Sequence, residues 1–509
     1  MFLSILSSLS TLRLKHVKNM VSVVSGDAQQ GGKAMLKATL RSAVLLGLLV
    51  WSIPSYAEVQ NIKVSGDTTT RAFMRKNLDL NRNDSVTNRH SRFLMQTTGI
   101  NVEADLTENV SAHVRVANER DWNTASTADG GADEHGGDIK LSQAYVTLKE
   151  LFYSPLTLRV GTQPIVWGRG FVLGSNLIPG TVLRGGDAQR SISADEFTDY
   201  TAFDAIRGTL DLSGVGGLGI PLTIDGVYIK LSDRNVQIGD DLNLMGVNFS
   251  TKFDNSEAEA YFLNKRDGQL GTSPVTDNNG NLNTWGIRGS TKPVEGSDLW
   301  GELAYQQGTR TQDPDGLRVQ GEHVSAWAAD FGGRYTLTDV AMKPGLGLEW
   351  VFWSGKNKSD GVSTTGAQAG WDPIARGYFT TAIREFQTRN GSSFFYPVAQ
   401  NNVTAAVTNQ HQLAVFGDLD PIEDLHVNSR FTWFVADVPM VTRADNATSG
   451  SNKGRNSFIG TEWDTQLTYN YTDDVQFGVF HALFAPGNVF RTPNDDTAQE
   501  VITWAKVTF

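Results

Sequence analysis

The sequence predicts an all-β fold, a transmembrane antiparallel up-and-down β-barrel of 18 strands, with 16 strands as the alternative. Three observations support this fold class. Segments that alternate apolar and polar residues recur from residue 58 onward, no run of about 18 apolar residues occurs there, and the last residues form one more alternating segment. Because a helical membrane span needs roughly 18 or more apolar residues in a row, strands remain as the spanning elements.

The first element along the chain is an export signal. Lys37 and Arg41 precede an apolar run over 43–53, and the small-residue site Ser55-Tyr56-Ala57 follows shortly after it. A basic flank, a short apolar run and a small-residue site in this order are typical of a secretory signal peptide. The run is too short to anchor the chain in a bilayer. We therefore expect cleavage after Ala57.

The signal divides the chain into two parts. We expect residues 1–57 to be an upstream extension and a cleaved signal peptide, with the true start at Met35 or Met20, and residues 58–509 to be a single barrel. Removing residues 1–57 takes away six basic residues and one acidic residue, so the net charge falls from −11 to −16. Phosphate binding needs a basic surface, and this charge therefore argues against a nucleic-acid partner. The absence of Cys excludes disulfides and suits a protein that crosses an oxidising periplasm.

The predicted strands show the alternation expected of a wall with two different faces. Leu299, Leu303 and Tyr305 alternate with Glu302 and Gln306, so one face is apolar and the other polar. The same pattern recurs over 101–106, 206–212 and 462–470. Because segments rich in Gly, Asn, Asp and Ser separate these stretches, we expect one antiparallel meander.

A soluble sandwich would show the same alternation, so the direction of burial needs its own argument. Short connections such as 106–109 and 471–474 contrast with long polar ones such as 123–138, 269–281 and 356–372, the asymmetry typical of outer-membrane barrels. Aromatic residues also cluster at predicted strand ends, as expected where rings lie at both membrane interfaces. These clusters are Trp350, Phe352 and Trp353; Phe431, Trp433 and Phe434; and Tyr469 and Tyr471.

The last segment predicts a closing strand. Val501, Ala505, Val507 and Phe509 fall on one face of it, and the chain ends on an aromatic residue. We expect the barrel-assembly machinery to recognise this strand through Phe509. The further partners that we expect are outer-membrane lipid, lipopolysaccharide and a hydrophilic solute, while the sequence leaves open whether the barrel is a monomer or a homo-oligomer.

No pattern of catalytic or metal-binding residues is found in the sequence. The eight histidines are scattered without a metal-ligand spacing, and no Gly-x-Ser-x-Gly elbow occurs. The glycine-rich stretch 214–219 lacks the Lys and Ser or Thr of a phosphate loop, and the acidic stretch 129–138 lacks the ligand order of an EF-hand. We therefore expect neither an enzyme nor a cofactor or metal site.

Several segments resemble the alginate-export family of outer-membrane proteins, and the resemblance extends over residues 60–509. The segments that carry it are Gln143–Lys149, Pro155–Gln163, Val166–Gly170, Phe203–Arg207, Leu346–Glu349 and Phe484–Gly487. The resemblance implies an 18-stranded barrel whose lumen carries arginines that attract an anionic polysaccharide. It thereby implies a porin-like channel in the outer membrane, used for passive transport or export.

The candidate pore-lining residues follow from the resemblance together with the alternation. Arg115, Arg159 and Arg207 fall on polar faces, Glu119 and Tyr145 fall on the same faces nearby, and Arg169 and Arg184 follow Trp167 on a stretch that we expect to fold into the lumen. Arginine suits anion binding because it stays charged and binds carboxylates in a fork. An alternative for each arginine is pairing with a neighbouring acid.

The overall acidity conflicts with an anion-conducting lumen. Acidic stretches occur over 129–138 and at Asp195, Glu196 and Asp199, and acidic outer loops around a basic pore would reconcile the two. We therefore expect a passive channel for hydrophilic solutes, including anionic polysaccharides. The alternative function is a structural or docking barrel with a plugged pore that anchors an envelope complex.

Overall fold

The computed structural model describes most of the chain after residue 60. The described residues are 61–78, 80, 90–122, 139–153, 155–175, 197–214, 221–232, 241–268, 280–312, 318–355, 370–386, 408–442, 454–490 and 495–509. The expected signal peptide, Arg184 and the acidic stretch 129–138 lie outside these residues.

Within the described residues the chain forms 18 strands and two short helices. The strands are β1 (Asn61–Lys76), β2 (His90–Thr107), β3 (Val110–Asp121), β4 (Lys140–Leu148), β5 (Leu156–Gln163), β6 (Phe203–Asp211), β7 (Leu222–Ser232), β8 (Leu242–Phe253), β9 (Ser256–Asp267), β10 (Gly280–Thr291), β11 (Ser297–Gln312), β12 (Arg318–Thr336), β13 (Gly345–Trp353), β14 (Gln410–Ile422), β15 (Leu425–Thr442), β16 (Gly454–Asn470), β17 (Val475–Pro486) and β18 (Ala498–Thr508). The helices are η1 (Leu151–Tyr153) and α3 (Ile383–Phe386). No helix in this part of the chain has the length and apolar character needed to cross a membrane.

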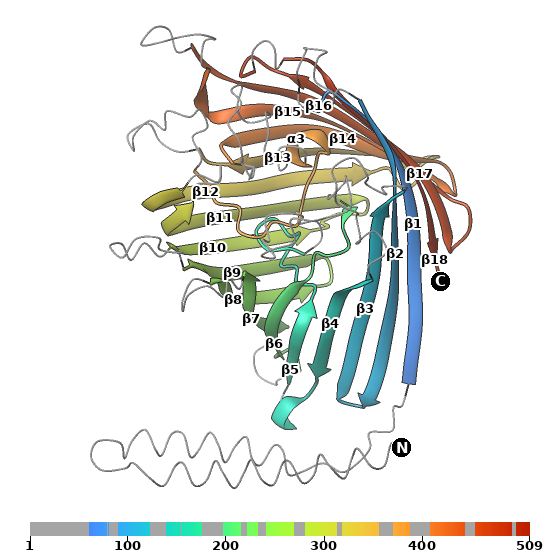
Figure 1. Ribbon diagram of the computed structural model, residues 1–509, viewed down its shortest axis with the longest axis vertical. Coiled ribbons are helices and arrows are strands. Elements are labelled where there is room, and N and C mark those ends of the chain that lie inside the picture. Colours follow the sequence, from blue (N-terminus) through green and yellow to red (C-terminus); the bar gives the residue numbers. More distant parts are fainter. Residues whose placement is uncertain are drawn as a thin grey trace, which may run out of the picture. The chain divides into compact units, whose positions relative to one another are not determined.

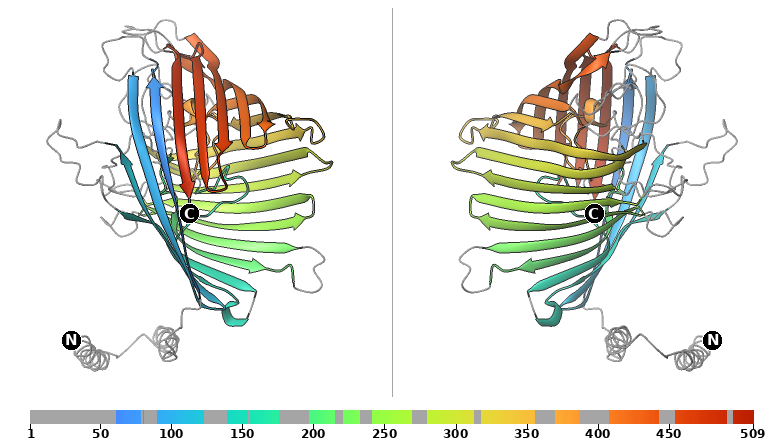
Figure 2. Two further views of the ribbon diagram at one scale, coloured as in Figure 1. Left: turned by 90° about the vertical axis from the view of Figure 1, so that its right-hand side faces the viewer. Right: turned by 90° about the vertical axis from the view of Figure 1, so that its left-hand side faces the viewer.

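The strands form one closed sheet in sequence order. Each strand pairs antiparallel with its neighbours along the chain, and β1 pairs with β18 from Asp67 opposite Thr508 to Lys76 opposite Gln499. Figures 1 and 2 show the resulting wall of strands, with β18 beside β1. The predicted all-β antiparallel barrel is confirmed, with 18 strands and not the alternative of 16.

The two faces of the wall differ as the alternation predicted. On β11 the outward Leu299 is 46% exposed, whereas Glu302 and Gln306 point inward and are buried. Outward apolar side chains recur around the ring, Trp327 among them at 46% exposed. The expectation was wrong for Trp353 and Phe434. Both rings are fully buried, Trp353 stacks on Phe171, and Phe434 packs against Phe484.

The connections at the two ends of the barrel differ in length. At one end, β2–β3, β8–β9 and β14–β15 are joined by two residues each, 108–109, 254–255 and 423–424. The opposite end carries connections as long as 164–202 and 354–409. Outer-membrane barrels place short turns toward the periplasm and long loops outside, so we orient the barrel with its short-turn end in the periplasm.

Parts of the two longest connections fold into the barrel. We call residues 164–175 the first inner segment and residues 370–386 the second inner segment. The buried hydrophobic core lies where these segments meet the inner wall, with Trp167 and Leu173 from the first segment and Trp371 and Ala375 from the second. Figure 1 shows α3, which belongs to the second inner segment, inside the ring of strands.

Candidate pore and its inner segments

The first inner segment is bound to the wall through β7 and β9. The indole Nε1 of Trp167 donates to Asp225 Oδ2 at 2.8 Å, and the backbone N of Gly168 donates to Glu259 Oε2 at 3.1 Å. Asp225 also accepts from Arg207 Nε at 2.8 Å. Arg207 is therefore neutralised by an acid that at the same time holds the first inner segment.

The second inner segment is bound to a different part of the wall. The Asp372 carboxylate accepts from Lys265 Nζ at 3.0 Å. The Gln306 side chain makes two hydrogen bonds with the backbone of Asp372, accepting from its N at 2.9 Å and donating to its O at 2.7 Å. Further on, Glu462 of β16 accepts from the backbone N of Ile383 at 2.6 Å and of Arg384 at 2.8 Å. These two amides begin α3, and a carboxylate at that position satisfies donors that have no partner within the helix.

The two inner segments cross each other inside the barrel. Gly174 N donates to Ala375 O and Gly377 N donates to Gly170 O, both at 2.8 Å. A β-carbon added at Gly377 would lie 2.6 Å from the carbonyl carbon of Gly174. The crossing therefore requires glycine at position 377, because a side chain there would collide with the backbone of Gly174.

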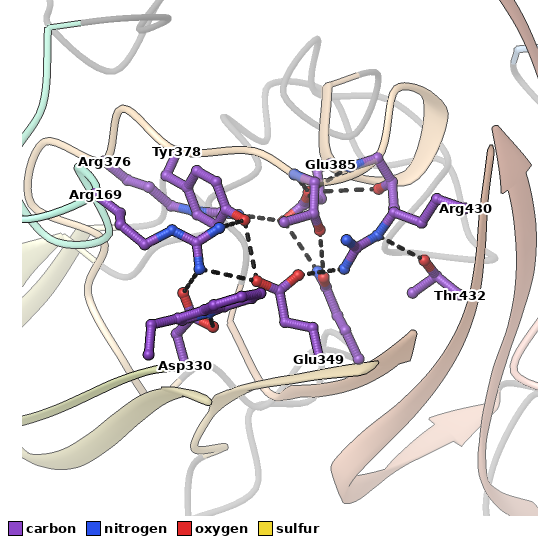
Figure 3. A network of polar contacts seen from close by, with 12 residues as sticks. Arg169, Asp330, Glu349, Arg376, Tyr378, Glu385, Arg430 and Thr432 are labelled. Carbon is purple, nitrogen blue, oxygen red and sulfur yellow. Dashed lines mark hydrogen bonds and ion pairs between the residues drawn. The ribbon is translucent and has the colours of Figure 1, made fainter. Parts of the chain in front are cut away.

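A polar network joins this crossing to β12, β13 and β15 (Figure 3). At its centre Glu349 bonds Arg169 Nη1 at 3.3 Å and the hydroxyl of Tyr378 at 3.0 Å, and it also pairs with Arg430. Arg169 Nη1 lies 3.5 Å from Asp330 Oδ2 and the guanidinium bonds the Tyr378 hydroxyl. Burial, together with the Glu349 carboxylate, raises the pKa of Tyr378, so the phenol stays protonated and donates.

A second carboxylate, Glu385, organises the second inner segment from within. It pairs with Arg376, accepts from the backbone N of Thr381 at 2.8 Å, and accepts from Gln412 Nε2 of β14 at 3.0 Å. Burial by itself would raise its pKa, but Arg376 and these donors hold the pKa of Glu385 below its usual value. The carboxylate is therefore ionised in the fold, where it fixes the segment against β14.

Arg115 and Glu119 both bind the chain just before β6. The Arg115 guanidinium reaches Asp199 with 2.9 Å from Nε to Oδ2, and Asp67 with 2.9 Å from Nη2 to Oδ1. Glu119 accepts from Thr198 Oγ1 at 2.9 Å and from the backbone N of Asp199. Asp199 is thus a lumenal anchor and not part of an acidic outer loop.

Arg159 has a different environment near the short-turn end of the lumen. Its guanidinium carbon lies 4.8 Å from the centre of the Tyr145 ring, and its Nε donates to Thr147 Oγ1 at 3.3 Å. His113 stacks on Tyr145 with 4.9 Å between ring centres, and Glu103 lies 3.6 Å from His113. Among the described residues no carboxylate forms an ion pair with Arg159.

The candidate residues therefore fall into three groups. Arg159, Tyr145 and Arg207 lie together, since Arg159 and Arg207 are opposite each other on β5 and β6. The second group contains Arg115 and Glu119, which share the strand β3 and the partner Asp199. Arg169 alone makes up the third group, and it contacts Asp330 of β12 and Glu349 of β13.

Sequence reasoning missed the acidic residues that hold the inner segments. Asp225, Glu349 and Glu462 lie on inward faces, which the alternation would have indicated. Their partners could not be identified in the same way. The alternation indicates which face of its strand a residue occupies, but it does not indicate which residue of a distant loop contacts it. In the described part of the chain no group of His, Asp or Glu is suited to hold a metal ion.

Comparison with known proteins identifies the family. The family model described as alginate export matches residues 246–503, which include the segments Leu346–Glu349 and Phe484–Gly487 but not the four earlier segments that carried the resemblance. No curated protein matches the sequence significantly.

Three similar solved structures are distant in sequence. OccAB1 of Acinetobacter baumannii is 12% identical with a TM-score of 0.49, over 90% of this chain and 99% of that one. OccK8 (OprE) of Pseudomonas aeruginosa is 11% identical with a TM-score of 0.49, over 88% and 98%. A BenF-like porin from Pseudomonas fluorescens Pf-5 is 11% identical with a TM-score of 0.48, over 89% and 100%. Because the family model spans just over half of the chain, the protein belongs to the alginate export family and is an outer-membrane, porin-like β-barrel.

Proposed function

We propose that the barrel is a passive channel for hydrophilic solutes and that it favours solutes carrying carboxylates, such as acidic polysaccharides. The solute crosses without chemical conversion. Membership of the alginate export family and a closed wall with polar inward residues support transport through the lumen. The preference for carboxylates rests on a single observation, the environment of Arg159.

Arg159 differs from the other candidate arginines that the structure describes, because it has no carboxylate partner among the described residues. Arg115 is neutralised by Asp67 and Asp199, and Arg207 by Asp225. An arginine without a carboxylate partner binds a carboxylate of a solute through two parallel hydrogen bonds. Arg207 lies directly opposite Arg159 on the neighbouring strand, but its charge is neutralised by Asp225, so the positive charge offered to a solute at this place is that of Arg159.

The test is the ion preference of the purified barrel in a planar bilayer. In a salt gradient the wild type should show a reversal potential of the sign for anions, and Arg159→Gln should move it toward cations. The matched control is Arg266→Gln, because Arg266 is exposed on the outward face of β9. Cation preference of the wild type, or an unchanged reversal potential in Arg159→Gln, would refute the proposal.

A docking barrel with a plugged pore is the second candidate function. The observation in its favour is the apolar core inside the barrel, where Trp167, Phe171, Trp353 and Trp371 are buried beneath the crossing of the inner segments. If folded barrels inserted in a bilayer carry no ion current at all, the docking function replaces the channel.

The route to the membrane is part of the proposal. We propose that the signal peptide is cleaved after Ala57, which N-terminal sequencing of the mature protein would test. We further propose that the assembly machinery binds the last strand through Phe509. This residue supports closure directly, because its backbone exchanges two hydrogen bonds with Gly66 of β1, at 2.7 and 2.9 Å.

A further inference from the structure

We propose that the outward face of β1–β3, at the long-loop end of the barrel, binds the phosphate groups of lipopolysaccharide. The residues that carry this inference are Lys76, Arg92 and Arg120, which we call the outer basic cluster. They lie on three consecutive strands, and all three side chains are exposed. The proposal depends on the position in the outer membrane and not on the conductance of the pore.

The alternation along each strand places the cluster on the outside. On β1, Phe73 and Arg75 are buried inside whereas Met74 is 55% exposed, so Lys76 lies on the same outward face as Met74. On β2, Leu94 is 40% exposed, and Arg92, two residues before it, lies on the same outward face. Lys76 is opposite His90 and Met74 is opposite Arg92, so Lys76 and Arg92 are diagonal neighbours on one face, within reach of a shared ligand.

The cluster lies at the upper border of the apolar band. Below it the outward residues of β2 are apolar, with Ile100 and Val102 both exposed toward lipid. At the level of Arg120, the ring of Trp122 is 49% exposed and its Nε1 donates to Gln96 at 3.2 Å. Trp is enriched where the hydrocarbon core meets the headgroups, so Arg120 lies at the inner edge of the headgroup region, and Lys76 and Arg92 lie farther out toward the long-loop end.

None of the three cations forms an ion pair with the described residues. At the same end of the barrel another outward cation is already neutralised, since Lys230 pairs with Asp241. Arg266 on β9 is exposed, but its neighbours across the sheet are the neutral Asn243 and Asn281. The register brings Lys76 and Arg92 close together, whereas Arg120 is opposite Gln96, four positions along β2 from Arg92. The three unpaired cations are therefore spread over the long-loop ends of three consecutive strands on the described outward face.

The charge of the cluster selects its occupant. Exposed cations that border a lipid surface attract anionic headgroups, and each Lys or Arg near the surface adds to this attraction. The long-loop end lies in the outer leaflet, where lipopolysaccharide supplies phosphates at headgroup depth. Arginine forms a bidentate contact with a phosphate and lysine adds a point charge, so the cluster matches a phosphorylated glycolipid.

The experiment compares lipid binding by the wild type and by the triple variant Lys76→Gln, Arg92→Gln and Arg120→Gln. Each mature barrel is refolded into lipid nanodiscs without lipopolysaccharide, and purified lipopolysaccharide is then titrated while bound lipid is counted by native mass spectrometry. Loss of three charge-assisted contacts should weaken binding at least about tenfold. Heat-modifiable gel mobility establishes that each variant is folded.

Two controls make the outcome decisive. Arg266→Gln should bind lipopolysaccharide as the wild type does, and enzymatically dephosphorylated lipopolysaccharide should bind the wild type as weakly as the intact lipid binds the triple variant. The proposal is overturned if the triple variant binds with unchanged affinity or if removing the phosphates has no effect. It is equally overturned if phosphatidylglycerol competes as well as lipopolysaccharide, since the site would then be a general anionic surface.

Discussion

Replacing Gly377 by alanine should separate the two inner segments and alter the pore. The added β-carbon would lie 2.6 Å from the carbonyl carbon of Gly174 and 2.8 Å from its oxygen. These are backbone atoms, which cannot rotate out of the way as the end of a side chain can. For the added β-carbon to lie at an ordinary contact distance of 3.4 Å from the carbonyl carbon of Gly174, the two inner segments must move apart by about 0.8 Å.

This displacement is enough to break the crossing. The bonds from Gly174 N to Ala375 O and from Gly377 N to Gly170 O are both 2.8 Å, and an added 0.8 Å takes each beyond hydrogen-bond distance. Two backbone hydrogen bonds contribute about 0.5–1.5 kcal/mol each, and overpacking costs about 1–3 kcal/mol. The crossing should therefore be destabilised by about 2–6 kcal/mol.

Two measurements test the Gly377 prediction. In single-channel recordings, Gly377→Ala should show larger current fluctuations and a larger mean conductance than the wild type, because the segments that narrow the lumen become mobile. Hydrogen exchange of the Gly174 and Gly377 amides should be faster by about 30-fold or more, since each 1.4 kcal/mol corresponds to tenfold. Conductance and exchange identical to the wild type would refute the reasoning.

The matched control is Gly208→Ala on β6. A β-carbon at Gly208 would meet only Leu156 Cδ1, at 3.9 Å, so the space for it exists. This variant should behave as the wild type in both measurements. An equal change in Gly208→Ala and Gly377→Ala would mean that the effect comes from losing glycine in general and not from the crossing.

Two further predictions concern the second inner segment and the closure of the barrel. Glu462→Ala leaves the amides of Ile383 and Arg384 without their acceptor. At about 1–3 kcal/mol for each buried unsatisfied donor, their hydrogen exchange should become about 30-fold faster or more, and unchanged exchange would contradict this anchor. Gly66→Val places a side chain where the Phe509 ring lies, 2.6 Å from a β-carbon at Gly66, and should destabilise the β1–β18 closure by about 1–3 kcal/mol. The temperature at which heat-modifiable mobility is lost should fall, and adding Phe509→Leu should restore part of it; an unaltered temperature in Gly66→Val would contradict the prediction.

The fold could be predicted because one rule applies to every strand. A strand in this wall has lipid on one side and the lumen on the other, so its side chains alternate in polarity with a period of two. Leu299 and Glu302 were placed on their correct sides by this rule alone. Trp353 was misplaced because an aromatic ring at a strand end has a second possible environment, the apolar core beneath the inner segments.

The contacts of the inner segments could not be predicted, because they join residues far apart in the sequence. Arg169 and Glu349 are 180 positions apart, yet they are bonded inside the lumen. Alternation indicates that Glu349 points inward and the resemblance indicates that Arg169 lies on a lumenal loop, but neither specifies their pairing. The pairing depends on how the two inner segments pass each other, which the glycine contacts at Gly174 and Gly377 determine.

The anchoring of the inner segments also reconciles the acidity of the chain with the proposed anion preference of the lumen. The formal net charge counts every carboxylate as free. Asp225, however, pairs with Arg207 and accepts a hydrogen bond from Trp167. Glu385 pairs with Arg376 and accepts hydrogen bonds from the backbone amides of Thr380 and Thr381. Such carboxylates are neutralised by the groups that they bind, and so they contribute little to the potential felt by a solute. On the proposed function, a solute meets the charge that remains after anchoring, and among the candidate arginines in the described part of the chain that charge is concentrated at Arg159. The selectivity of the pore should therefore follow this one residue and not the net charge of −11.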